Sequence, residues 1–361
     1  MNIVYVTSSD IKSGGARQAL ATLQGLRDRG HAVTFFVPQK AQLPLLDPDF
    51  NWRYLPEKRR DWGKAIEPEL AAMSRQNPFV VHAFHNKAVK LAAWWGLFWR
   101  RRGAVMIGHR GVIYKPNNPL PYWSPGLDAF IVNSKVCADI VHSKGVSRSR
   151  LHVVYNGIPA ERITPRRTPD AVRAELGLTD TDLVIGSVTD DSPNKGVDFL
   201  LRSWKAAHLP PNARLLLVGV HHEVWPPMAN ELGIPADRLL VVGRTECVAD
   251  YLQVMDAFVV SSHTESMPNA LLEGLSFGLP VISTAVGGIP ELVDGNGLLV
   301  PARDERAMTG ALAQLCRSPE QREAWGQRSA AIAAVFSMDY KTSQVEDIYK
   351  GLLAARSLPV A

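Results

Sequence analysis

The chain has 361 residues, of which 46% are hydrophobic and 21% are charged, a composition typical of a globular protein with material for about two domains. No apolar run reaches the ~20 residues that a membrane-spanning helix needs. Its three cysteines, Cys137, Cys247 and Cys316, lie far apart, so neither a disulfide framework nor a zinc cluster is expected. The net charge of +5 favours small anionic ligands or anionic surfaces as partners.

The start of the chain, MNIVYVTSS, predicts a first β-strand and lacks the pattern of a signal peptide, so a cytoplasmic location is expected. Short apolar runs then alternate with helical stretches, which is typical of α/β proteins with parallel sheets. A helix is expected over residues 16–29, ended by Gly30. The first half of the chain predicts strands at residues 2–7, 32–37, 80–82, 104–109, 129–133 and 151–155.

A polar stretch at residues 156–170 contains three prolines and predicts a linker. Beyond it, strands are expected at residues 183–188, 214–219, 239–242, 257–261, 281–284 and 297–300, followed by a mostly helical end. The predicted fold is α/β, with two Rossmann-like domains at residues 1–165 and 166–337. Such sheets bind ligands at the carboxyl ends of their strands, so a deep cleft between the domains is expected to hold the substrates.

The most informative segment runs over residues 256–300. Glu265 lies in the loop after a buried strand, and Pro268 is expected to open the next helix, where its missing N–H would be unpaired anyway. The free backbone N–H groups around Pro268 to Leu271 then form a site for phosphate oxygens. Glu265 and Glu273 flank this site, and carboxylates suit vicinal hydroxyls because their oxygens accept charge-assisted hydrogen bonds. The alternative is that both glutamates are ordinary surface residues.

This segment resembles the signature of the retaining glycosyltransferases of family 4, which have the GT-B fold. The similarity rests on the spacing Glu265-x7-Glu273, the following GLPVIST and VGGIPELV, the GLLV at 297–300, the NGIP at 156–159 and the NKGVDFLLRSW at 194–204. The resemblance covers nearly the whole chain and is strongest over residues 180–300.

The resemblance implies a role for each donor-site residue. Glu265 would face the donor sugar near the reacting centre, Glu273 would bind the ribose, and Lys195 would neutralise the diphosphate. The glycine loop at Gly14 and Gly15 would contact the donor from the first domain. The diphosphate would be cradled by the backbone of Ser266, Met267, Pro268, Asn269, Ala270 and Leu271.

One departure from the family pattern concerns the diphosphate. The family usually has an arginine about five residues before the lysine, whereas Thr189 or Asp190 stands there in this chain. A carboxylate facing a diphosphate is unfavourable unless another cation compensates. Candidate substitutes are Arg244, and Lys12 or Arg17 from the first domain.

The triplet Asp180-Thr181-Asp182 has the form of a metal-binding D-x-D motif. It precedes its strand instead of following it, so it is expected to cap a turn, and no catalytic metal or other cofactor is predicted.

On the acceptor side, His82 and His85 lie at the end of a predicted strand, where the family often shows H-x-H. One of them is expected to accept a proton from the acceptor hydroxyl, with His85 slightly favoured. His109 and Arg110 end another strand and are further acceptor candidates, Arg110 for an anionic acceptor or for a structural salt bridge.

Two more segments carry predictions. Tryptophans and arginines gather over Trp94 to Arg102, which indicates either a peripheral membrane contact or a core helix with a basic end. The apolar spacing of Val345, Ile348, Leu352 and Leu353 predicts one amphipathic helix. By the resemblance this helix, residues 338–361, returns to the first domain.

The resemblance implies a hexosyltransferase that uses a nucleoside-diphosphate sugar and acts on a glycan or a lipid-linked acceptor in cell-surface polysaccharide or lipopolysaccharide synthesis. A UDP-sugar is favoured, with GDP- and ADP-sugars as alternatives. A sugar-nucleotide 2-epimerase of the same fold and a non-catalytic nucleotide-sugar-binding relative are the competing functions.

Overall fold

The computed structural model describes residues 1–9, 13–74, 79–114 and 118–357. The chain forms two compact units: unit 1 is Met1–Gly157 with Met338–Ala361, and unit 2 is Ile158–Ser337. The division falls before residue 158, not between residues 165 and 166 as predicted. The physical reason is local: the N–H of Ile158 donates to the carbonyl of Phe336 at 2.7 Å, and Arg162 pairs with Glu273, so residues 158–165 belong to unit 2.

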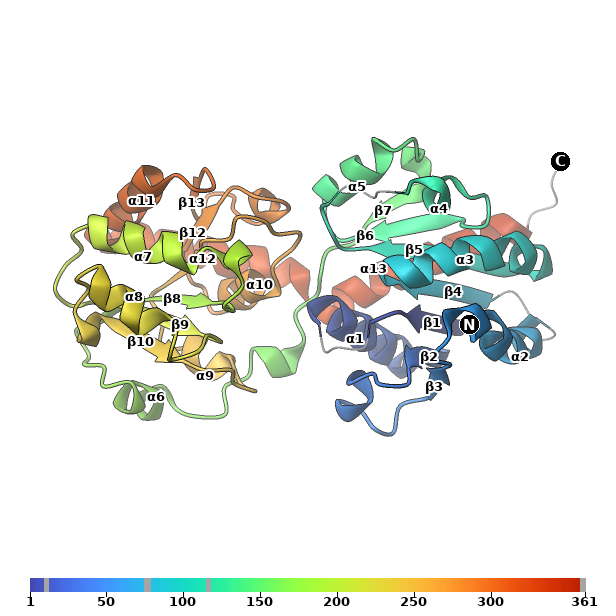
Figure 1. Ribbon diagram of the computed structural model, residues 1–361, viewed down its shortest axis with the longest axis horizontal. Helices are drawn as coiled ribbons and strands as arrows, with labels where there is room; N and C mark the ends of the chain where they lie inside the picture. Colours follow the sequence, from blue (N-terminus) through green and yellow to red (C-terminus); the bar gives the residue numbers. More distant parts are fainter. Residues whose placement is uncertain (10–12, 75–78, 115–117, 358–361) are drawn as a thin grey trace. The chain divides into compact units, whose positions relative to one another are not determined.

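Unit 1 is built on a seven-stranded parallel sheet in the order β3-β2-β1-β4-β5-β6-β7 (Figure 1). Its strands are β1 (Asn2–Thr7), β2 (Ala32–Pro38), β3 (Trp52–Leu55), β4 (Phe79–Phe84), β5 (Ala104–Arg110), β6 (Ala129–Val132) and β7 (Leu151–Val153). The sequence did not predict β3, because this short edge strand has two exposed residues and no apolar run. The other six strands are confirmed, each within a few residues of its predicted ends.

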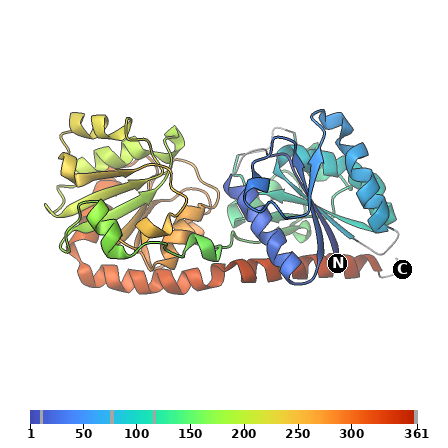
Figure 2. The same ribbon diagram turned by 90° about the horizontal axis from the view of Figure 1, so that it is seen from below.

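Helices cover both faces of this sheet, and each face has its own apolar core. They are α1 (Gly14–Asp28), α2 (Trp62–Ser74), α3 (His85–Trp99), α4 (Leu120–Trp123), α5 (Lys135–His142) and α13 (Met338–Ser357). The predicted terminal helix is confirmed as α13 over residues 338–357, and its predicted residues 358–361 lie outside the described part of the chain. Its Val345 and Tyr349 are buried in the same core as Tyr5 of β1, and it lies beside α1 (Figure 2).

Unit 2 has a six-stranded parallel sheet in the order β10-β9-β8-β11-β12-β13. Its strands are β8 (Leu183–Val188), β9 (Ala213–Val218), β10 (Leu239–Val242), β11 (Ala257–Val260), β12 (Val281–Thr284) and β13 (Gly297–Val300). Its helices are α6 (Pro169–Glu175), α7 (Val197–Ala206), α8 (Trp225–Glu231), α9 (Ala249–Leu252), α10 (Asn269–Ser276), α11 (Glu305–Arg317) and α12 (Pro319–Ala333). All six predicted strands are present, because their apolar runs are buried between helices on both faces.

Candidate active site

The loops after β8 and β11 form the centre of the candidate site in unit 2. The sheet order reverses between these two strands, which lie side by side in parallel register with Ala257 opposite Ile185. Open α/β sheets bind ligands beyond the carboxyl ends of the strands at such a switch point. The loop after β8 carries Lys195, and the loop after β11 carries Glu265.

Hydrogen bonds to backbone carbonyls hold these two loops against each other. The hydroxyl of Ser261 donates to the carbonyl of Lys195 at 2.9 Å, and the N–H of His263 donates to the carbonyl of Asn194 at 2.7 Å. Gly196 has φ +64°, and a Cβ at this position would lie 2.4 Å from the carbonyl oxygen of Ser261. A side chain therefore does not fit there, which explains the glycine after Lys195.

The side chains of the two loops meet in an ion pair. Nζ of Lys195 lies 2.5 Å from Oε1 of Glu265, and the hydroxyl of Ser262 donates to the same oxygen at 3.1 Å. Both side chains are partly buried, so this charge pair is screened less than a surface pair. It presents a cation suited to phosphate beside a carboxylate suited to hydroxyls.

A third loop, after β12, supports the backbone of Glu265. Gly287 has φ +56°, and a Cβ there would lie only 1.6 Å from the carbonyl oxygen of Glu265. The N–H of Gly288 donates to the carbonyl of Ser266 at 2.8 Å. The paired glycines of the VGGIPELV motif thus allow one backbone to pack directly on another.

Helix α10 follows the Glu265 loop. Pro268 is its N-cap residue, with φ −74° and ψ 116°, so the helix starts at Asn269, one residue later than expected. The first turn therefore consists of Asn269, Ala270 and Leu271, after Ser266 and the buried Met267. An N-terminal turn of this kind favours negative charge.

Glu273 is buried in α10 and is held by an arginine that the sequence reasoning missed. Arg162 donates from Nε to Oε1 at 2.8 Å and from Nη2 to Oε2 at 3.1 Å. Burial alone would lower the pKa of Arg162, but the hydrogen bond and charge of Glu273 outweigh it and raise that pKa. This two-pronged pairing fixes the orientation of the Glu273 carboxylate. The only sequence signal for Arg162 was its position just after the NGIP motif.

Asp190, at the position of the family arginine, and its neighbour Asp191 accept hydrogen bonds within the described loops. Asp190 accepts from the N–H of Ser192 at 2.9 Å. Burial would raise the pKa of Asp190, but the Ser192 hydrogen bonds and the charge of Lys195 lower it on balance. Asp191 accepts from the indole N–H of Trp225 at 2.7 Å and from the N–H of His221 at 3.1 Å.

Of the substitute cations, Arg244 is exposed just past the carboxyl end of β10. No ion pair or hydrogen bond of its guanidinium is found within the described part of the chain. Arg17 is exposed in the first turn of α1, and Lys12 lies outside the described residues.

The predicted acceptor residues lie in unit 1 at its own switch point, between β1 and β4. His85 starts α3 with φ 67°, and its Nδ1 lies 2.8 Å from Oγ1 of Thr7, the last residue of β1. A Cβ at Gly15 would lie 3.5 Å from Nε2 of His85, so the exposed Gly15 borders this ring nitrogen, and the exposed Gly14 precedes it in the chain. Burial lowers the pKa of His85, which keeps the ring neutral and able to accept a proton.

His82, the other predicted acceptor histidine, lies inside unit 1 and not at the edge of the sheet. Its side chain points into the core of unit 1, is 1% exposed, and lies with Nδ1 2.5 Å from the hydroxyl of Tyr349. Burial lowers its pKa well below the ordinary value. His82 and His85 are three residues apart, and the strand ends between them, so only His85 reaches the edge of the sheet.

His109 and Arg110 end β5 next to this edge. The His109 ring stacks on Phe84 with ring centroids 4.5 Å apart, and burial lowers its pKa to about 3. Arg110 is 2% exposed and donates to the hydroxyl of Tyr122 at 2.5 Å and to the carbonyl of Tyr114. Within the described residues no carboxylate pairs with it. Its guanidinium therefore lies inside unit 1, and the structural salt bridge offered as the alternative is not found among the described residues.

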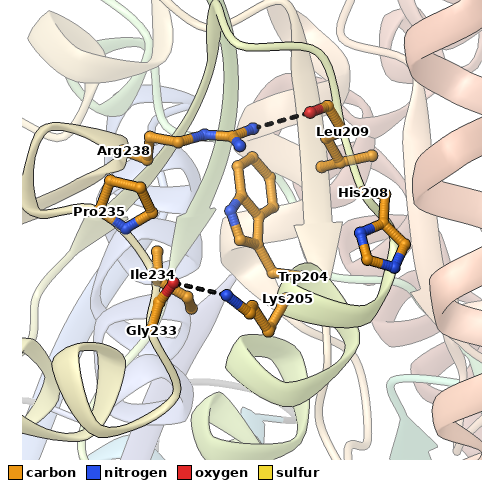
Figure 3. A pocket seen from close by; sticks show the side chains of 8 residues that line it. All are labelled: Trp204, Lys205, His208, Leu209, Gly233, Ile234, Pro235 and Arg238. Carbon is orange, nitrogen blue, oxygen red and sulfur yellow. Dashed lines mark hydrogen bonds between the residues drawn. The ribbon is translucent and has the colours of Figure 1, made fainter.

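Two other features lie away from the site. Asp182 caps a turn, as predicted, by accepting from the N–H of Thr179 at 2.8 Å. A separate pocket near the amino ends of β9 and β10 is lined by Trp204, Lys205, His208, Leu209, Gly233, Ile234, Pro235 and Arg238 (Figure 3). Its cations bind backbone carbonyls: Lys205 donates to Gly233 at 2.6 Å, and Arg238 to Pro210 at 2.8 Å. No residue of the predicted donor site lines it.

The chain is similar to known glycosyltransferases over both of its units. A family model described as Glycosyltransferase Family 4 matches residues 12–162, and one described as Glycosyl transferases group 1 matches residues 181–318. A D-inositol 3-phosphate glycosyltransferase from Saccharomonospora viridis is 31% identical over 63% of this chain and 56% of its own length. An N-acetyl-alpha-D-glucosaminyl L-malate synthase from Bacillus anthracis is 28% identical over 56% of this chain and 54% of its own. The chain thus spans about half the length of these curated relatives.

The fold is that of solved proteins with two Rossmann-like domains. HepE from Anabaena, solved with UDP, superimposes with a TM-score of 0.83 at 19% identity, covering 97% of this chain and 100% of that one. The same protein with UDP-glucose gives a TM-score of 0.80 over the same shares at 19% identity. The two family models, which match both units, identify the chain as a member of the family 4 glycosyltransferases.

Proposed function

We propose that the chain is a retaining glycosyltransferase that uses a nucleoside-diphosphate sugar and acts on a glycan or a lipid-linked acceptor in cell-surface glycan synthesis. The observation that carries the proposal is the Lys195–Glu265 ion pair of 2.5 Å at the switch point of the unit 2 sheet. A UDP-sugar is the favoured donor, because the similarly folded HepE was solved with UDP and with UDP-glucose.

In this proposal Glu265 accepts hydrogen bonds from the donor sugar, and Glu273, oriented by Arg162, accepts them from the ribose. Lys195, Arg244 and the first-turn amides of α10 stabilise the diphosphate as it leaves, so the charge is balanced without a metal ion. His85 takes the proton of the acceptor hydroxyl.

The acceptor is proposed to be anionic. Arg110 acts at a distance, because a buried cation with no carboxylate partner among the described residues raises the potential at the ends of β4 and β5. The names of two relatives contain inositol 3-phosphate and L-malate, both of which are anionic compounds.

A thermal-shift screen against UDP-, GDP- and ADP-sugars tests donor binding, because a bound ligand raises the melting temperature by mass action. Acceptors bearing phosphate or carboxylate are then added with the best donor, and the configuration of the product is read by NMR. Isomerisation of the donor without acceptor would instead show an epimerase. Donor binding without turnover on any acceptor would show a non-catalytic relative, and no shift with any donor would overturn the proposal.

A further inference from the structure

Helix α3 has an outward face that is apolar where a surface helix is normally polar. Its inward face, with Ala88, Ala92 and Gly96, packs in the core of unit 1. On the outward face Trp94 is 69% exposed, and Leu97 and Phe98 are 43% and 48% exposed. The spacing of these residues, i, i+3 and i+4, places them on one side of the helix.

Helix α4, which contacts α3, also exposes apolar residues. Its Leu120 and Trp123 are 61% and 53% exposed and lie one helical turn apart. The hydroxyl of Ser124 donates to the carbonyl of Ala93 at 2.7 Å, and Figure 1 shows α3 and α4 side by side. The five exposed residues, which we name the aromatic patch, are Trp94, Leu97, Phe98, Leu120 and Trp123.

Basic residues surround the aromatic patch. On α3, Lys87 and Lys90 precede it and are exposed, and Arg101 and Arg102 follow it and are exposed. The Arg102 guanidinium lies 4.1 Å from the centroid of the Phe98 ring. No Asp or Glu occurs between Glu69 and Asp128, whereas eight lysines and arginines do. This one segment thus carries more positive charge than the net +5 of the whole chain.

We propose that the aromatic patch and its basic surround bind the surface of a bilayer that contains anionic lipids. Tryptophan and phenylalanine enter the region between headgroups and acyl chains, and lysine and arginine neutralise the headgroups. A second copy of the chain fits this face poorly, because each copy would bring its acid-free basic segment against the other. Vesicle binding needs neither donor nor acceptor, so this inference goes beyond glycosyl transfer and stands or falls independently of it.

The test is co-sedimentation of the full chain with vesicles of phosphatidylcholine alone and of equal parts phosphatidylcholine and phosphatidylglycerol. The patch variant is Trp94→Ser/Leu97→Ser/Phe98→Ser. The charge variant is Arg101→Gln/Arg102→Gln, which spares Arg100 because it pairs with Asp128 at 2.8 Å. A matched control, Leu45→Ser/Val335→Ser, changes residues that are 71% and 57% exposed elsewhere.

The wild type and the control should bind the anionic vesicles alike, and the patch variant should bind at least tenfold more weakly with an unchanged melting temperature. The charge variant should lose affinity for anionic vesicles and lose part of the salt dependence. Equal binding by the patch variant would overturn the proposal. A dimer seen by sedimentation velocity that the patch variant abolishes, without vesicle binding, would overturn it in favour of self-association.

Discussion

Lys195 and Glu265 stand 70 positions apart in the chain, yet Nζ of the first lies 2.5 Å from Oε1 of the second. The ion pair joins two loops that meet only because β8 and β11 are neighbours in the sheet. A donor diphosphate would compete with Glu265 for the ammonium group, which would leave the carboxylate free to accept hydrogen bonds from the sugar.

Substitutions of Glu265 and of Lys195 should change different kinetic constants. Glu265→Gln should lower kcat by about 100-fold or more, because the Glu265 carboxylate acts on the reacting sugar. The donor should still raise the melting temperature of this variant. Lys195→Gln should raise the KM of the donor. The rate of nucleoside-diphosphate release gives kcat and the KM of the donor for both variants. Glu223→Gln, a change at an exposed residue, is the control. A transfer rate of Glu265→Gln equal to that of the wild type would contradict the assignment of Glu265 to the active site.

Gly287→Ala should disturb the Glu265 loop, since a Cβ there would meet the Glu265 carbonyl at 1.6 Å and φ is +56°. We expect a loss of about 1–3 kcal/mol in the free energy of unfolding together with a fall in transfer activity. Urea unfolding and the transfer assay measure the two effects. In Gly310→Ala of α11, the added Cβ would meet no atom within 4 Å. This control should change neither the free energy of unfolding nor the transfer activity. Equal behaviour of the two variants would contradict the packing argument.

Removing Arg162 should destabilise unit 2 by taking the paired cation away from the buried Glu273 carboxylate. Arg162→Met should cost about 3–5 kcal/mol, and Arg162→Met/Glu273→Leu should cost less than the single change. Chemical denaturation of the wild type and the two variants measures both differences in the free energy of unfolding. A double variant that is less stable than Arg162→Met would show that the pairing with Glu273 is not the cause.

The pH profile of transfer should report His85. Its pKa lies below the ordinary value because the ring is buried, so the neutral, proton-accepting form persists to lower pH than in a free histidine. The rate should therefore be flat through neutral pH and fall only below about pH 6.5. In His85→Gln this acid limb should vanish and the plateau should drop. An identical limb in the variant would exclude His85 as the base.

The buried Lys341 of α13 should make stability depend on pH. Burial lowers its pKa to about 7, and its ammonium nitrogen lies 2.7 Å from the side-chain oxygen of Gln18, a neutral group. The unfolded chain holds this proton up to about pH 10.5 and the folded chain only to about pH 7, so this lysine makes stability rise with pH between those values.

Lys341→Met should therefore stabilise the protein by roughly 2–4 kcal/mol at pH 7, and the gain should shrink as the pH approaches 10. Thermal melts at pH 7, 8.5 and 10 measure it. A gain that does not change with pH, or a loss at pH 7, would mean that the lysine is not buried with a low pKa.

The sequence by itself determined the alternation of strands and helices and the two-domain class. It also determined that Glu265 lies in a loop between a buried strand and a helix, because apolar runs and turn residues act locally. Only the tertiary structure decided that Lys195 pairs with Glu265, that Arg162 holds Glu273, and that His82 points into the core while His85 stands at the edge. These depend on which strands are neighbours and on where each strand ends, and periodicity along the chain encodes neither.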